Sequence, residues 1–171
     1  NNTPTAVADN NTITFNALVD GIYDNCKISV DNNSNTSDNL SVSSFTIDTT
    51  PPTLAETTAV PTFTNDNSTQ YTFSSSEGGT IAIGGSCSSD NNTAVADNMT
   101  VSFAALPDGT YSNCTITVTD SAGNSSDTID VNSFTIDTTA PTLAQVAAVT
   151  TPTKDTTPSY TFSSNEAGNI T

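Results

Sequence analysis

Two stretches of the chain, residues 44–50 and 133–139, both read Ser-Phe-Thr-Ile-Asp-Thr-Thr. In each of them Phe and Ile alternate with polar residues, and the polar partners are largely Thr, a β-branched residue suited to a pleated strand. The same alternation occurs at residues 12–15 and 115–118, and no stretch has the 3.6-residue period of an amphipathic helix. The sequence therefore predicts an all-β protein.

The repetition extends beyond these two stretches. The sequence Ala-Val-Ala-Asp-Asn begins at Ala6 and again at Ala94, and Tyr-Thr-Phe-Ser-Ser begins at Tyr71 and again at Tyr160. The offsets of 88 and 89 residues define a repeating unit of about 88 residues, which is the size of a small β-sandwich. We therefore expect tandem β-sandwich repeats.

The repeat frame divides the chain into three parts. Residues 49–137 are expected to form one complete unit, residues 1–48 the C-terminal part of another, and residues 138–171 the N-terminal part of a third. Two interpretations of the partial units are open. Either the ends of the chain are arbitrary with respect to the repeat, or the partial units complete one another between neighbouring copies, as in assembly by strand donation.

Alternating residues and turn signals predict the strands of the complete unit. They are expected at residues 53–60, 69–75, 80–84, 110–119 and 128–136, with a hairpin or arm at 93–105. The expected core consists of nine apolar side chains: Phe73, Ile81, Ile83, Val101, Phe103, Tyr111, Ile116, Val118 and Phe134.

The composition excludes several classes of functional site. Eighteen Asp and Glu residues oppose only Lys27 and Lys154, giving a formal net charge of −16 and no basic surface for nucleic acid or an anionic membrane. Because His is absent, a Ser-His-Asp triad and a histidine zinc site are excluded. Asp120 and Asp127 are a conceivable glycosidase pair, but Trp is also absent, so we expect no enzyme. The sequence contains no run of about 18 apolar residues, so it predicts no transmembrane helix.

Four segments together resemble the bacterial immunoglobulin-like repeats of giant surface adhesins and surface fibres. They are residues 71–79, 108–111, 117–124 and 134–143. The resemblance covers essentially the whole chain. It implies tandem immunoglobulin-like β-sandwiches at the cell surface, acting as stalks that project a binding tip, often with calcium at domain junctions. The cysteines depart from the commonest family pattern and favour a covalently reinforced fibre.

The three cysteines follow the repeat. Cys26 and Cys114 occupy the same position of the unit, and the equivalent of Cys87 in the preceding unit falls just before residue 1. We therefore predict a disulfide between Cys87 and Cys114, with Cys26 pairing with a residue that lies outside these 171 residues. The alternative, a reactive or metal-binding thiol, requires a base or a neighbouring cation. A structural disulfide implies an oxidising, extracellular setting.

Five carboxylates are candidate calcium ligands. In an immunoglobulin-type sandwich the linker residue Asp48 lies near Glu77 and Asp120, which occupy two turns at the same end of the unit. Asp137 and Glu166 hold the first two of these positions at the next junction. Carboxylates from three loops would supply several of the roughly six to eight oxygen ligands that calcium prefers. The alternative is that these acids cap turns and stay solvated.

These features predict a structural repeat of an extracellular bacterial surface filament or adhesin stalk, whose partners are copies of itself along a fibre. Disulfides would resist unfolding, and prolines next to the Thr-Thr linkers, Pro52 and Pro141, would limit bending. Two alternatives are a passive spacer of a monomeric adhesin, whose glycan or protein ligand is bound elsewhere in the full chain, and an immunoglobulin-like module that itself binds such a ligand.

Overall fold

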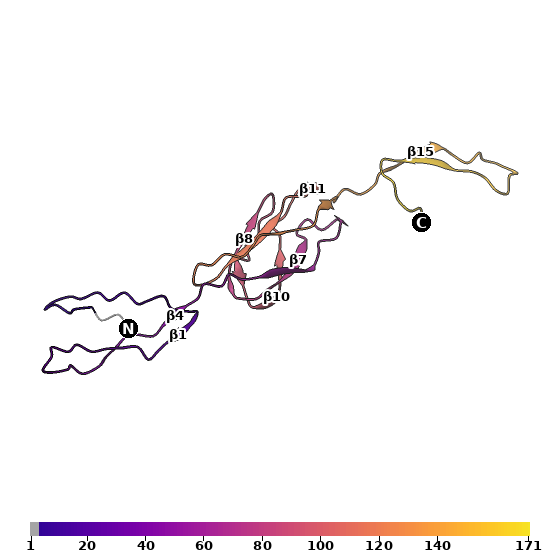
Figure 1. Ribbon diagram of the computed structural model, residues 1–171. Coiled ribbons are helices and arrows are strands. Elements are labelled where there is room, and N and C mark those ends of the chain that lie inside the picture. The colour runs from indigo at the N-terminus through magenta and orange to yellow at the C-terminus, as the bar shows by residue number, and fades with distance from the viewer. Residues whose placement is uncertain (1–3) are drawn as a thin grey trace.

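The computed structural model describes residues 4–171, and every regular element in that range is a β-strand. The strands form several sheets, nearly all of them antiparallel, so the predicted all-β class is confirmed. Figure 1 shows a central part that carries most of the strands, with an N-terminal part and a C-terminal hairpin on opposite sides of it. Within residues 4–171, no helix is long and apolar enough to cross a membrane.

The central part, residues 49–137, contains ten strands. They are β5 (Leu54–Thr58), β6 (Phe63–Thr64), β7 (Gln70–Ser75), β8 (Gly79–Gly84), β9 (Thr93–Ala94), β10 (Asp97–Ser102), β11 (Gly109–Tyr111), β12 (Thr115–Thr119), β13 (Ile129–Asp130) and β14 (Phe134–Ile136). Their sheets have the orders β10-β7-β5, β13-β12-β8-β9 and β11-β14-β6. Because β7 and β8 belong to different sheets, the short turn between them carries the chain from one sheet to another.

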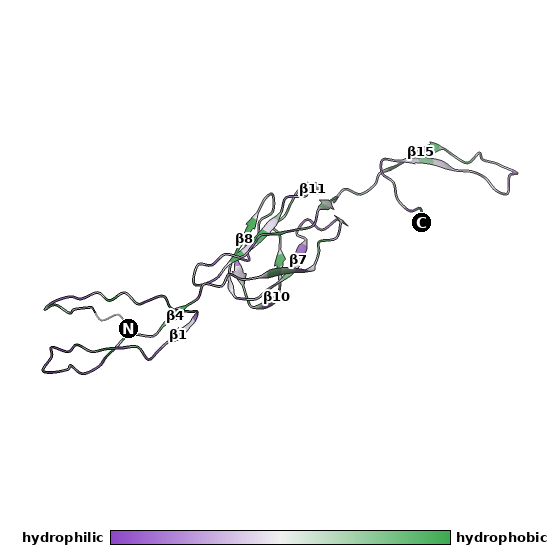
Figure 2. Cartoon of the chain, viewed as in Figure 1, coloured by the Kyte–Doolittle hydropathy of each residue, from purple (hydrophilic) through white to green (hydrophobic). Residues whose placement is uncertain are grey.

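Side chains from all three sheets meet in one buried cluster. Seven of the nine core residues expected from the sequence are buried, and the other two, Ile83 and Tyr111, are partly buried against the cluster. The cluster also includes Tyr71 and Ile136, which the pattern did not single out. Figure 2 shows hydrophobic colour on the strands of the central part. Burial of each large apolar side chain contributes roughly 1.5–3 kcal/mol, so this cluster is the main source of folding free energy.

Two strands that the alternation predicted as continuous are each interrupted. The predicted strands 110–119 and 128–136 are divided into β11 and β12, and into β13 and β14, and the halves join different sheets. Side-chain hydrogen bonds replace the ladder near one break: the amide of Asn132 accepts the N–H of Val60 at 2.9 Å and donates to its carbonyl at 2.8 Å. At each break two consecutive polar residues, Ser112-Asn113 and Asn132-Ser133, shift the alternation by one residue, and the prediction of continuous strands did not take this shift into account.

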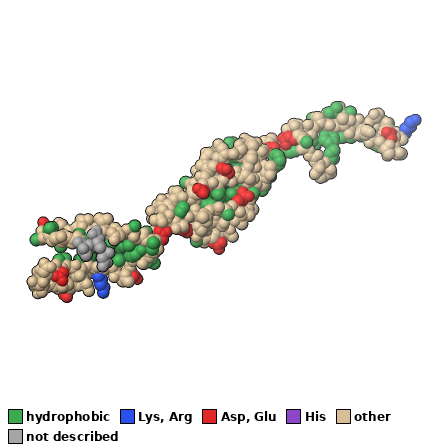
Figure 3. Space-filling view, in the orientation of Figure 1, with side chains coloured by type: hydrophobic (Ala, Val, Ile, Leu, Met, Phe, Trp, Pro, Cys, Tyr) green, Lys and Arg blue, Asp and Glu red, His purple; other side chains and the backbone are tan. Residues whose placement is uncertain are grey.

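The two flanking parts hold fewer and shorter strands. The N-terminal part, residues 4–48, contains β1 (Gly21–Tyr23), β2 (Lys27–Ile28), β3 (Leu40–Ser41) and β4 (Phe45–Ile47), and the C-terminal part contains β15 (Leu143–Ala147) and β16 (Thr161–Ser164). Most apolar side chains in both parts are exposed or only half-buried. Figure 3 shows hydrophobic side chains on the surface of each flanking part.

The flanking strand pairs have the registers of central pairs. With the offset of 88 or 89 residues, β1–β4 matches β11–β14, β2–β3 matches β12–β13, and β15–β16 matches β5–β7, including its bulge. The rings of Tyr23 and Phe45 stack at 5.3 Å, as do those of Tyr111 and Phe134. We call residues related by this offset counterparts. The division of the chain into three immunoglobulin-like units stays a prediction.

Candidate metal centre

Three of the five candidate carboxylates lie together at one end of the central part. One carboxylate oxygen from each of Asp48, Glu77 and Asp120 lies within 4.8 Å of the others, so the three could hold a metal ion between them. Asp48 follows β4, Glu77 lies in the turn between β7 and β8, and Asp120 follows β12 directly. Three segments far apart in the sequence therefore converge on one point.

Asp120 is the most firmly held of the three. Its Oδ1 accepts the backbone N–H groups of Ala122, Gly123 and Asn124 at 2.8, 2.7 and 2.9 Å, and its Oδ2 accepts the Asn124 side-chain amide at 2.8 Å. Gly123 has a φ of 96°, a conformation that side chains rarely adopt, and this lets the turn close around the carboxylate. The hydrogen bonds, that from the Asn124 side chain foremost, lower the pKa of Asp120, so it is ionised at neutral pH.

The pKa of Glu77 is affected by the other two carboxylates of the cluster. Its side chain is half-buried, and this burial, followed by the negative charges of Asp48 and Asp120, raises the pKa of Glu77. A cation placed among the three carboxylates would reverse the effect of both neighbours. The donor set is all oxygen, without Cys or His, which favours a hard ion such as calcium over zinc.

The remaining two candidates are not assembled in the same way. Within residues 4–171, Asp137 and Glu166 belong to no group of three acidic ligands. Glu166 instead accepts a hydrogen bond from the side chain of Asn165 at 3.2 Å. The counterpart of Asp120 at this junction falls after residue 171. A second metal site therefore stays a prediction.

The predicted disulfide between Cys87 and Cys114 is present. It joins the loop after β8 to the start of β12 across a sequence separation of 27, with the two Cα atoms 5.3 Å apart. Both residues are buried in the core cluster. Cys26, the counterpart of Cys114, is a half-buried free thiol in the described part of the chain.

Each Thr-Thr linker, at residues 49–50 and 138–139, is held by an aspartate that the sequence pattern did not single out. The carboxylate of Asp108 accepts the N–H and hydroxyl of Thr138 at 3.1 and 2.8 Å and the hydroxyl of Thr139 at 3.0 Å. Its counterpart Asp20 makes the same three bonds to residues 49–50, at 3.1, 2.9 and 2.9 Å. The bonds from these threonines lower the pKa of both aspartates. The repeated Asp-Gly and Thr-Thr pairs, at fixed spacing, were the available signal.

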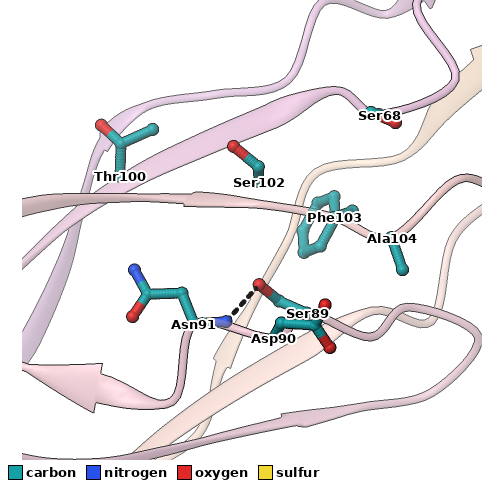
Figure 4. A pocket seen from close by; sticks show the side chains of 8 residues that line it. All are labelled: Ser68, Ser89, Asp90, Asn91, Thr100, Ser102, Phe103 and Ala104. Carbon is teal, nitrogen blue, oxygen red and sulfur yellow. Dashed lines mark hydrogen bonds between the residues drawn. The ribbon is translucent and has the colours of Figure 1, made fainter.

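A shallow hollow of about 380 Å³ lies beside β10 (Figure 4). Its lining is mostly hydroxyl and amide groups, from Ser68, Ser89, Asp90, Asn91, Thr100, Ser102, Phe103 and Ala104. Ser89 Oγ is already used, because it accepts the N–H of Asn91 at 3.1 Å. The single aromatic side chain, Phe103, is buried in the core. The hollow therefore offers a ligand no exposed aromatic platform.

No protein-family model and no curated protein sequence matches the chain. The resemblance to bacterial immunoglobulin-like surface repeats thus stays a prediction from the sequence.

Proposed function

We propose that this protein is a structural segment of an extracellular surface filament or adhesin stalk, built from tandem immunoglobulin-like β-sandwich units. The observation that carries the proposal is the repeated joint. Asp20 and Asp108 hold their respective Thr-Thr linkers by the same set of three hydrogen bonds. A series of units joined by identical fastened linkers is suited to transmit force and keep its length.

The linker at residues 48–52 is fastened from both sides. From the preceding part, Asp20 holds the two threonines of the linker. From the central part, the side-chain amide of Asn124 donates to the carbonyl of Asp48 at 3.1 Å. Pro52 is buried and has a fixed φ, which further reduces the conformations available to the joint. These contacts favour an extended and stiff junction.

Calcium is the ion that we propose for the triad of Asp48, Glu77 and Asp120. The triad joins the linker to two turns of the central part, so an ion bound there would tie both sides of the joint together. Calcium accepts carboxylates in irregular geometry and completes its shell with carbonyls and water. Burial raises the pKa of Glu77 most, and the negative charges of Asp48 and Asp120 raise it further; a bound cation would offset the repulsion from these two charges.

The cellular location and the partners that we propose follow from the disulfide and the net charge. The disulfide between Cys87 and Cys114 favours an oxidising location outside the cytoplasm, such as the cell surface. The net charge of −16 keeps a long array soluble and self-repelling, which salt or calcium would relieve. The partners that we propose are copies of the chain along a fibre. Neither the hollow beside β10 nor the charge favours a ligand-binding module or an enzyme.

Pulling single molecules from their two ends tests the mechanical role. Because the disulfide closes a loop of 27 residues whose ends stay 5.3 Å apart, unfolding of the central part should lengthen the oxidised chain by about 85–90 Å less than the reduced chain. The oxidised central part should also resist a higher force. Unfolding at negligible force, with no distinct step for the central part, would contradict a mechanical role.

A further inference from the structure

The strand β10 is the longest free edge of the central part. It pairs with β7 over six residues without a bulge, and no strand among the described residues pairs with its other side. The remaining edge strands of the central part are shorter or interrupted: β6, β9, β11 and β13 have two or three residues each, and β5 contains a bulge. An edge strand without a bulge, Pro or Lys is open to pairing with another chain, and β10 carries none of these.

The pairing with β7 determines which backbone groups of β10 point outward. The N–H of Phe103 donates to the carbonyl of Thr69, directly opposite, at 3.0 Å. In an antiparallel pair the opposing residues alternate between bonded and non-bonded positions, so every second residue back from Phe103 bonds to β7. The residues between them, Asn98, Thr100 and Ser102, therefore direct their N–H and C=O groups away from β7.

Both ends of this edge are closed by contacts within the central part. At one end the carboxylate of Asp97 accepts the N–H of the next residue at 2.7 Å. At the other end the carbonyl of Ser88 accepts the N–H of Ala104 at 2.8 Å. Between these two closures, the exposed residues Thr100 and Ser102 each present an N–H and a C=O to solvent.

The shallow hollow described above lies beside this free stretch. Thr100 and Ser102 line it on the side of β10, and residues 89–91 line it on the side of the loop before β9 (Figure 4). Its volume of about 380 Å³ gives room for a short extended segment. The hollow alone favours no ligand. The free backbone groups beside it do, because an added strand bonds to the backbone and needs no aromatic platform.

The charge around the hollow selects a positively charged occupant. Asp90 is the only charged residue that lines the hollow, and it is exposed. Residues 49–137 contain ten Asp and Glu residues and neither Lys nor Arg, so the electrostatic potential around the hollow is negative. A segment with Lys or Arg is therefore attracted. The edge of a second copy of the central part carries the same excess of acid and is repelled.

We infer that the free edge of β10 binds an extended basic segment of a partner protein by strand addition. A segment antiparallel to β10 exchanges two hydrogen bonds with Thr100 and two with Ser102, and its Lys or Arg pairs with Asp90 across the hollow. All the lining residues belong to the central part, which spans one full period of the repeat, so the site depends on neither flanking part. This inference goes beyond the proposed function, because a stalk does not require such a site.

Hydrogen exchange of the full chain, followed by NMR, tests strand addition with the peptide Thr-Lys-Thr-Lys-Thr-Lys-Thr as the probe. The peptide should slow exchange at the amides of Thr100 and Ser102 by about tenfold or more, because each becomes a donor to the added strand. The amides of Met99 and Val101 should not change, since they already bond to β7. This alternation of changed and unchanged amides is specific to strand addition.

Variants of the full chain test the contacts through the affinity for the same peptide, measured by fluorescence anisotropy at low salt. Asp90→Lys should weaken binding by about tenfold, because attraction becomes repulsion. The matched control Asp130→Lys makes the same change in net charge on β13, in a different sheet, and should weaken binding by less than about threefold. Thr100→Pro removes one outward N–H, which an edge strand tolerates, and should also weaken binding by about tenfold.

Three results would overturn the inference. The first is no detectable binding of the peptide at millimolar concentration, and the second is an equal loss of affinity in Asp90→Lys and Asp130→Lys. The third is slowed exchange at Thr100 and Ser102 that rises with protein concentration alone, which would make a second copy the occupant. None of these results would affect the stalk proposal, which the force measurement tests.

Discussion

Replacing Cys87 and Cys114 together by Ala should lower the free energy of unfolding of the central part by about 3.5 kcal/mol. The magnitude follows from the sequence separation of 27, because closing a loop of that length removes conformational entropy from the unfolded chain. Both residues are also buried, so removal of the sulfurs leaves a small void and adds to the loss. Since a domain of this size is stable by only roughly 5–15 kcal/mol, the change is large.

Urea unfolding of the full chain, followed by circular dichroism, measures this effect. With a slope of about 1–2 kcal/mol per molar urea, the midpoint should fall by about 2 M or more. Reduction of the parent protein should reproduce the shift, and Cys26→Ser should leave the midpoint unchanged because Cys26 is a free thiol. A double variant whose midpoint stays within about 0.3 M of the parent would refute the assignment of the disulfide as a major source of stability.

Three further predictions concern the joint. Removal of calcium by a chelator should lower the melting temperature of the parent protein, measured by calorimetry, but not that of Asp120→Asn. The control variant Asp127→Asn should respond as the parent does. Equal responses of all three proteins would exclude the triad as the calcium site. The raised pKa of Glu77 means that its ionisation opposes folding, a penalty absent at low pH and complete once the pH exceeds the pKa of the folded state. In calcium-free protein, Glu77→Gln should therefore raise the melting temperature at neutral pH and leave it unchanged at about pH 3. Finally, Asp108→Ala removes all three linker bonds, so hydrogen exchange at the Thr138 amide should accelerate without a change at the core; unchanged exchange would show that the linker is held by other contacts.

The strands and the core were largely predictable because they follow from alternation. Phe73 and Val101 lie on strands with a period of two, and both are fully buried. The breaks at residues 112–114 and 131–133 were missed, although a pair of consecutive polar residues shifts the alternation at each of them. The side-chain contacts that replace the ladder there were not predictable, because they join segments distant in sequence. Asn132, for example, bonds to Val60, 72 residues away, and nothing in the local pattern marks that pairing.

The candidate site was predictable only to the extent that the fold places strand ends together. Asp48, Glu77 and Asp120 could be grouped because each lies beside a strand end, and these strand ends meet at one end of the immunoglobulin-type sandwich that the sequence resembles. The bonds from Asp108 to residues 138–139 were missed because an exposed Asp before Gly ordinarily indicates only a turn. Its repetition with the Thr-Thr pair was the informative signal, since two positions that recur together at fixed spacing can be in contact.

Electron microscopy of the native material tests the central claim most directly. At about 3.3 Å per strand residue, each unit should advance the array by roughly 30–40 Å. The account predicts extended filaments or stalks with that axial repeat, shortened or bent after calcium is removed. Compact particles without an axial repeat would contradict it.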